Sequence, residues 1–194
     1  MHDSKTTYHH GNLRPALIRS ALKILDTEGT ERLSMRALAE ALNVSRSALY
    51  HHFESKQALL AAIAEQGFSH LNKLVEDSID SKASNETLDA AVAGYLRFAT
   101  SHKAQYTLMF SPLLWHTEAE TPFQRYAKDC FRLYVSLFEK LQREGVIKST
   151  EPPLRLAQII WSSLHGLAML MNDEILSTHD ELDTLSQHLV NRFR

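Results

Sequence analysis

The segment SMRALAEALNVSRSALYHHF, residues 34–53, constrains the fold most, because it predicts two short helices joined by a tight turn. Ser34 and Ser45 are suited to cap the two helix starts, since a serine hydroxyl accepts a hydrogen bond from a backbone N–H that lacks a helical partner. Asn43 follows the first helix, and asparagine tolerates the left-handed conformation that ends a helix. The segment therefore predicts a compact two-helix unit.

The second of these helices carries polar and aromatic side chains on its outer face. Leu49 and Phe53 recur at helical spacing and are expected to face inward. The side chains left outside are Arg46, Ser47, Tyr50 and His52. A small apolar interior with such an outer face is what a helix-turn-helix needs to place its second helix in the major groove of DNA.

A longer stretch around this unit resembles the DNA-binding domain of the TetR/AcrR family of transcriptional regulators. The matching pattern covers about residues 8–63, from LRPALIRSALKILDTEG through ALYHHFESKQALL. A bare helix-turn-helix pattern is a weak signal, whereas these segments in this order are specific. The resemblance implies an all-α protein of about nine helices. A three-helix head would be followed by a helical body that binds an effector and forms a homodimer.

Composition agrees with a helical protein of two parts. The 194-residue chain contains only six Gly and five Pro, and 44% of its residues are hydrophobic. We expect a DNA-binding domain over residues 1–56 and an effector-binding and dimerisation domain over residues 57–194, linked by a helix from about residue 55. No membrane span or signal-peptide core is evident, and the single Cys130 cannot form an intrachain disulfide. A cytoplasmic location is therefore expected.

Charge is divided unevenly between the two parts. The whole chain has a net charge of −2, which by itself speaks against nucleic acid. Residues 1–56, however, hold eight Lys and Arg against six Asp and Glu, whereas the remainder holds thirteen against seventeen. The weakly positive head and acidic body have the signs expected of a DNA-binding regulator.

Apolar residues at helical spacing predict the other helices. Their approximate ranges are 12–28, 55–79, 86–102, a short helix before residue 110, and 122–143. Residues 111–122 are predicted as a loop. Beyond residue 152, one helix is predicted to extend through Ile175, and a last helix to carry Leu182, Leu185, Leu189 and Phe193.

The family pattern assigns eight head residues to DNA. The base-facing positions are Arg36, Arg46, Ser47 and Ala48. An arginine reads guanine O6 and N7 with both ends of its guanidinium, whereas Ala48 offers only a methyl group. The phosphate-facing positions are Ser45, Tyr50, His52 and Lys56, which would position the protein without specifying sequence. The alternatives are solvated surface side chains and, for Tyr50, packing against the first helix. Met35 stands where the family often has a hydroxyl, so no contact is carried over there.

The resemblance also implies an effector cavity in the body. Candidate lining residues are Tyr95, Phe98, Tyr106, Met109, Phe110, Tyr134, Trp161 and His165. Any single one of them is equally explained as ordinary core. The segment from Trp161 to Gly166 resembles a Trp–His–Gly signature of one subgroup of TetR C-terminal domains. His165 would offer a hydrogen bond in the cavity or lie at the dimer interface. Because few charges interrupt the apolar stripes, a mainly apolar or aromatic effector is expected.

The last two predicted helices are apolar on more than one face, which favours a homodimer in which they pair with a second copy. The interface candidates are Leu164, Ala168, Met171, Leu185 and Leu189. Two heads related by a two-fold axis demand a palindromic operator.

Enzymatic and metal chemistry find no support in the pattern. The adjacent pairs His9-His10 and His51-His52 diverge on a helix, and no zinc-protease, phosphate-loop or nucleophile-elbow motif occurs. We therefore expect no catalytic residue, no metal and no cofactor. The predicted function is sequence-specific regulation of transcription, by family habit repression relieved by a small molecule. The alternatives are an effector-independent DNA-binding protein and a helical enzyme or carrier.

Overall fold

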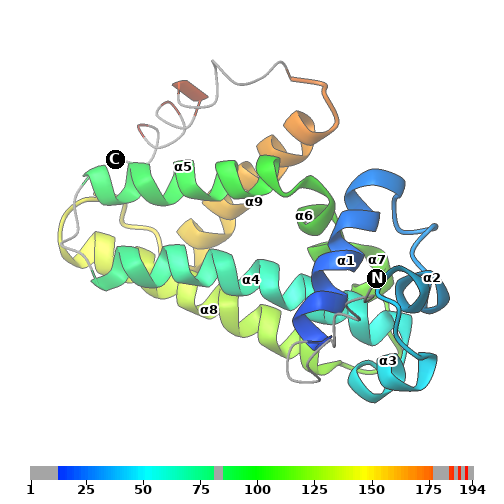
Figure 1. Ribbon diagram of the computed structural model, residues 1–194. Coiled ribbons are helices and arrows are strands. Elements are labelled where there is room, and N and C mark those ends of the chain that lie inside the picture. The colour runs from blue at the N-terminus through cyan, green and yellow to red at the C-terminus, as the bar shows by residue number, and fades with distance from the viewer. Residues whose placement is uncertain (1–12, 81–84, 177–183, 186–187, 189–190, 192–194) are drawn as a thin grey trace, which may run out of the picture.

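The computed structural model describes residues 13–80 and 85–176, together with residues 184, 185, 188 and 191. The described part is helical and contains no strand (Figure 1). The helices are α1 Leu13–Glu28, α2 Met35–Ala41, α3 Arg46–His52, α4 Lys56–Asp80, α5 Asn85–Ser101, α6 Lys103–Met109, α7 Pro112–Trp115, α8 Pro122–Arg143 and α9 Pro153–Asn172. The predicted all-α class, with a three-helix head and a helical body, is confirmed.

The head is held by short helices whose ends are capped as the sequence predicts. The Ser34 Oγ accepts from the Ala37 backbone N–H at 3.1 Å, and the Ser45 Oγ accepts from the Ala48 backbone N–H at 3.1 Å. Asn43 has a φ of 50°, so the turn between α2 and α3 uses the left-handed conformation that asparagine tolerates. These caps and the turn fix how α3 follows α2 within the head.

Helix α4 belongs to both the head and the body. Its 25 residues contact α1 in the head and α5, α6, α7 and α8 in the body (Figure 1). Near the middle of α4, a Cβ added to Gly67 would lie 2.4 Å from the Met109 Sδ of α6. The Gln105 Nε2 of α6 also donates to the Ile63 carbonyl at 2.9 Å. Helix α6 therefore packs directly on the α4 backbone.

The body is a four-helix arrangement in which neighbouring helices contact in a ring. Helix α4 packs on α5 and α8, and α9 packs on the other sides of α5 and α8. Helix α8 has the predicted bounds, because Thr121 and Gln124 form a capping box at its start and Gly145 follows its end with a φ of 73°. Such a ring leaves its centre to be filled by side chains or left open.

Three expectations about the body are corrected or fall outside the description. The predicted loop at residues 111–122 contains α7, because Ser111 caps a helical turn that begins with Pro112. Helix α9 ends at Asn172, so Ile175 lies beyond it and is exposed. In the last predicted helix, Leu185 is helical and half-buried, whereas Leu182, Leu189 and Phe193 lie outside the described residues. Within the described part, no helix has the length and apolarity to cross a membrane.

Candidate DNA-binding surface and effector cavity

At the start of α3, one arginine side chain is exposed and has no partner among the described residues. Arg46 is the first residue of α3 and is exposed. Its guanidinium has no hydrogen bond or ion pair to the described residues. Tyr50, one turn further, is 50% exposed and does not pack into the core. Both side chains are placed on the outer face of α3, as the motif predicts, together with the half-buried Ala48.

The second candidate arginine is already engaged. The Arg36 Nε donates to the Glu40 Oε1 at 2.7 Å, one turn along α2, and both side chains are well exposed. An exposed pair of this kind contributes little stability and exchanges readily. Arg36 engages Glu40 through Nε alone, so its terminal nitrogens can contact a base directly, and Nε only after leaving Glu40.

The predicted phosphate-binding residues also have roles in the head itself. The Ser45 Oγ caps α3 and lies 3.0 Å from the Ser47 Oγ. The Lys56 Nζ donates to the Thr30 carbonyl at 2.7 Å, which ties the start of α4 to the turn after α1. His52 is half-buried at the end of α3, against the edge of His51. These residues hold the geometry of the surface on which Arg46 stands.

A cavity of about 590 Å³ opens among α4, α5, α8 and α9. Its walls are almost entirely apolar. Four of the predicted lining residues do line it: Tyr95, Phe110, Tyr134 and Trp161. Its volume is within the range of sites that enclose a small organic molecule.

The other four predicted lining residues lie outside the cavity wall. Phe98 is buried between α4 and α5, where its ring stacks on His70 and His102. Met109 is buried against the α4 backbone at Gly67. Tyr106 and His165 form a layer behind Tyr95 and Phe110. Their aromatic or thioether character indicated burial correctly, but burial alone did not distinguish wall from core.

Several lining residues were missed. Helix α4 contributes a stripe at helical spacing: Phe68, Leu71, Asn72, Leu74 and Val75. Helices α5 and α8 add, among others, Leu88, Ala91, Val92, Cys130, Phe131 and Phe138. The periodicity that marks these positions is the same for a packed stripe and for a cavity wall. Only the ring arrangement of the four helices separates the two.

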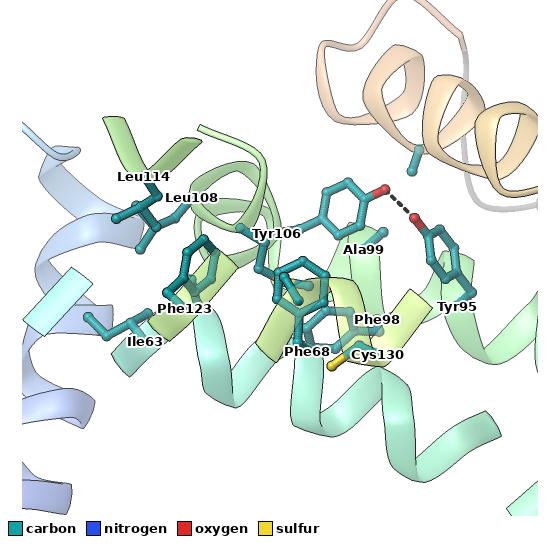
Figure 2. Close-up of a cluster of buried hydrophobic side chains, with 14 of the residues drawn as sticks. Ile63, Phe68, Tyr95, Phe98, Ala99, Tyr106, Leu108, Leu114, Phe123 and Cys130 are labelled. Atoms are coloured by element: carbon teal, nitrogen blue, oxygen red, sulfur yellow. Dashed lines mark hydrogen bonds between the residues drawn. The ribbon is translucent and has the colours of Figure 1, made fainter. Parts of the chain in front are cut away.

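A chain of hydrogen bonds connects the cavity wall with α9. The Trp161 Nε1 donates to the Tyr95 Oη at 3.1 Å, and the Tyr95 and Tyr106 hydroxyls are 2.7 Å apart (Figure 2). The Tyr106 Oη lies 2.7 Å from the His165 Nδ1. Burial raises the pKa of Tyr95 to about 12 and lowers the pKa of His165, so neutral phenols and a neutral imidazole are favoured. His165 therefore makes its hydrogen bond inside the protomer.

Three predicted interface residues are also inside the protomer. Leu164, Ala168 and Met171 are on the inner face of α9 and are at most 5% exposed. Side chains buried within one chain are not available to a second copy, so these assignments are corrected. The outward face of α9 instead carries Ile159 and Leu170, which are exposed, and Gly166, whose Cα has open space around it.

Helix α7 connects the cavity with the start of α4. Trp115 lines the cavity, and its Nε1 donates to the Met109 carbonyl at 2.7 Å. The Gln124 Nε2 of α8 donates to the Leu114 carbonyl at 2.9 Å. The Gln57 Nε2, in the first turn of α4, donates to the Leu113 carbonyl at 3.3 Å. Helix α7 thus links the cavity wall by hydrogen bonds to α4, the helix that follows α3.

Metal ligation has no site in the parts of the chain that the structure describes, since no three His, Cys, Asp or Glu side chains gather there. An exposed helix-turn-helix joined by one helix to a body with an apolar cavity defines a DNA-binding regulator with a small-molecule site. The family of bacterial regulatory proteins of the tetR type matches residues 17–63, and the tetracyclin repressor-like C-terminal domain matches residues 88–193. The chain belongs to the TetR family.

Some relatives match only the head of this chain, and others match its whole fold. The tetracycline repressor protein class C of Escherichia coli is 54% identical over 52 residues, which are 27% of this chain and 24% of that repressor. A structure of a protein of unknown function from Rhodococcus sp. RHA1 has a TM-score of 0.80 and 29% identity, and covers 97% of this chain and 99% of its own. AibR, solved with isovaleryl coenzyme A and operator DNA, has a TM-score of 0.65 at 19% identity, with 93% and 97% covered. The protein is accordingly a DNA-binding transcriptional regulator and not an enzyme.

Proposed function

We propose that the protein is a homodimeric repressor that leaves a palindromic operator when a mainly apolar small molecule fills the body cavity. The observation that carries the proposal is the double role of α4. Its first residue, Lys56, follows the recognition helix at a distance of four residues, and its residues between Phe68 and Val75 form a cavity wall. One rigid element therefore contacts both sites, which is what coupling between them requires.

On DNA, the proposed base contacts come from the start of α3. Arg46 is the main reader, because its guanidinium is free of partners among the described residues. Arg36 contributes through its terminal nitrogens, and Ser47 and Ala48 supply shorter contacts. Ser45, Tyr50, His52 and Lys56 contact phosphates from around the same face. Because DNA is the partner, the cytoplasm is the proposed location.

The proposed dimer uses the outward face of α9, with Ile159 and Leu170 around Gly166, and Leu185 of the following segment. Gly166 permits a close approach of two helices because no side chain stands over it. Two copies would present their α3 helices to successive major grooves about 34–36 Å apart. An effector that prefers a conformation with the heads at another spacing then shifts the population away from DNA.

The finer subgroup and effector assignments are also proposals. Trp161 and His165 have ring centroids 5.7 Å apart and both flank Phe110. This cluster supports membership of the Trp–His–Gly subgroup. The AibR complex shows that a related fold carries an acyl-coenzyme A and DNA together, which supports a small-molecule effector here. An effector-independent DNA-binding protein remains the second candidate, and the size of the cavity argues against it.

The test is selection of bound fragments from sheared genomic DNA, with wild type, Arg46→Ala and Arg143→Ala compared. Arg143 is an exposed arginine at the far end of α8, so its variant matches the change of charge without touching the head. We expect wild type and Arg143→Ala to recover one palindromic sequence, and Arg46→Ala to bind it about 10- to 100-fold more weakly. Sequence-blind binding by all three proteins would exclude the proposed function.

A further inference from the structure

The cavity wall carries one hydroxyl that has no hydrogen-bond partner among the described residues. Among its polar neighbours, the Tyr95 hydroxyl accepts from Trp161 and is paired with Tyr106, and the Asn72 amide donates to the Cys130 Sγ at 3.0 Å. Tyr134 also lines the cavity, but its hydroxyl has no hydrogen-bond partner among the described residues. The Tyr134 side chain is half-buried, so its unpaired hydroxyl on the cavity wall is available to a ligand.

The position of Tyr134 makes its hydroxyl a neutral donor and acceptor. Burial raises the pKa of Tyr134, and the nearby Tyr95 raises it further. The phenol therefore stays protonated at any physiological pH. A protonated phenol donates to a carbonyl oxygen or accepts from a hydroxyl, and it does not attract a cation as a phenolate would.

Among the described residues that line the cavity, no charged side chain is buried to balance an ionic ligand. The cations on the wall are Lys128 and Arg132 of α8, and both side chains are more than half exposed. Each also already has an acidic partner, Glu120 for Lys128 and Asp129 for Arg132. An anion drawn into the apolar interior would lose its hydration without gaining a buried counter-charge, which is strongly unfavourable. The cavity therefore selects against a carboxylate or phosphate in its interior.

We propose that the cavity takes an uncharged, mainly apolar molecule bearing one oxygen, and that Tyr134 hydrogen-bonds this oxygen and so selects it. The class comprises ketones, esters, lactones and phenols of a size that about 590 Å³ accommodates. Cys130 of α8 and Phe68 of α4, both labelled in Figure 2, line the cavity and would contact the apolar part of the molecule. This inference rests on the proposed role of the cavity as the effector site.

Three matched probes test the inference. They are 2-acetonaphthone, its hydrocarbon isostere 2-isopropenylnaphthalene, and 2-naphthoate, each titrated calorimetrically into the full-length protein without DNA. We expect wild type to bind the ketone about three- to tenfold more tightly than the hydrocarbon, the range of one added hydrogen bond. The carboxylate should bind at least about tenfold more weakly than the ketone.

Tyr134→Phe should remove the preference for the ketone and leave hydrocarbon affinity within about twofold, since the ring remains in place. Tyr126→Phe is the matched control for the calorimetry, because it makes the same change on α8 at a residue that does not line the cavity; it is left out of the Cys130 measurement, since the Tyr126 hydroxyl is hydrogen-bonded to Cys130. The chain has a single cysteine, so the rate at which the uncharged disulfide 4,4′-dithiodipyridine modifies Cys130 reports independently whether the cavity is filled. Each probe that binds should slow this reaction.

Three outcomes would overturn the inference: equal affinities for ketone and hydrocarbon in wild type, a ketone preference that survives in Tyr134→Phe, or tighter binding of the carboxylate. Operator affinity, measured separately by fluorescence anisotropy, addresses the proposed function. A ketone that binds through Tyr134 without weakening operator binding would remove the effector response and leave the inference intact. Release of the operator by a compound whose affinity does not depend on Tyr134 would support the effector response and contradict the inference.

Discussion

The head and the body are both built from helices, but their proposed functional residues lie in opposite places, outside in the head and inside in the body. In the head, short helices close around a solid interior, in which Leu38 and Leu49 are fully buried, and the functional side chains stand on the outside. In the body, longer helices leave a space at their centre, and the functional side chains face inward. A surface site can be read from polar residues within a motif, whereas an interior site consists of residues that resemble any core.

The largest expected difference concerns leucine truncation. Leu38→Ala in the head should lower the free energy of unfolding by about 3 kcal/mol, because a new void forms in a filled interior. Leu71→Ala on the cavity wall should lower it by only about 1 kcal/mol, because fewer atoms pack against Leu71. Chemical denaturation measures both values. Equal losses would show that the body closes its cavity in solution and would abolish the contrast.

A smaller effect is expected from filling the cavity. Ala91→Phe places an aromatic ring in the space and should weaken 2-acetonaphthone binding at least about tenfold, or 1.4 kcal/mol. Because filling the cavity is the proposed trigger for release, the ring should also weaken operator affinity without ligand through α4, although Ala91 is on α5 and remote from α3. Calorimetry and fluorescence anisotropy provide the two readouts. Operator affinity that is unchanged while ligand binding is lost would show that the head is independent of the cavity wall and would contradict the proposed coupling.

The turn of the head offers a test of about 1 kcal/mol. Asn43 has a φ of 50°, where a residue with a Cβ other than asparagine or aspartate is strained. Asn43→Ala should lower the free energy of unfolding by about 1 kcal/mol, whereas Asn43→Gly should leave it nearly unchanged. Thermal denaturation of the two variants beside wild type decides the matter. If alanine is as well tolerated as glycine, the turn adopts another conformation in solution.

The smallest effect is a dependence of stability on pH that comes from the body. Burial holds the pKa of His165 below its ordinary value of 6.5, so the unfolded chain binds more protons than the folded one just below that pH. The contribution of His165 is therefore present above pH 6.5 and is lost as the pH falls through the folded pKa. His165→Asn, which keeps an acceptor for Tyr106, should lack this part of the pH dependence. Denaturation of both proteins between pH 5 and 8 measures it, and identical profiles would contradict it.

The sequence predicted the local features of the head and several helix ends correctly, but it predicted only part of the interior of the body. The caps at Ser34 and Ser45, the turn at Asn43 and the bounds of α8 depend on local chemistry, so sequence pattern identified them. The cavity wall depends on which helices are neighbours, so Phe98 and Met109 were placed in it while Leu71 and Val75 were missed. The inner residues Leu164, Ala168 and Met171 of α9 were assigned to the dimer interface for the same reason, because Leu164 and the outer Ile159 are equally apolar.

The close crossing of α4 and α6 at Gly67 has a mechanical consequence. Helix α4 extends from Lys56 to Asp80, so Gly67 divides it into two arms of about 16 and 20 Å at 1.5 Å of rise per residue. With α6 pressed on the backbone at this point, Gly67 is a natural fulcrum. A rigid rod that tilts about such a point displaces its two ends by nearly equal distances in opposite directions. The part of the other arm that lines the cavity extends only to Val75, about 12 Å from Gly67, so a ligand that pushes Val75 outward by one ångström would swing the DNA-side end by about 1.4 Å.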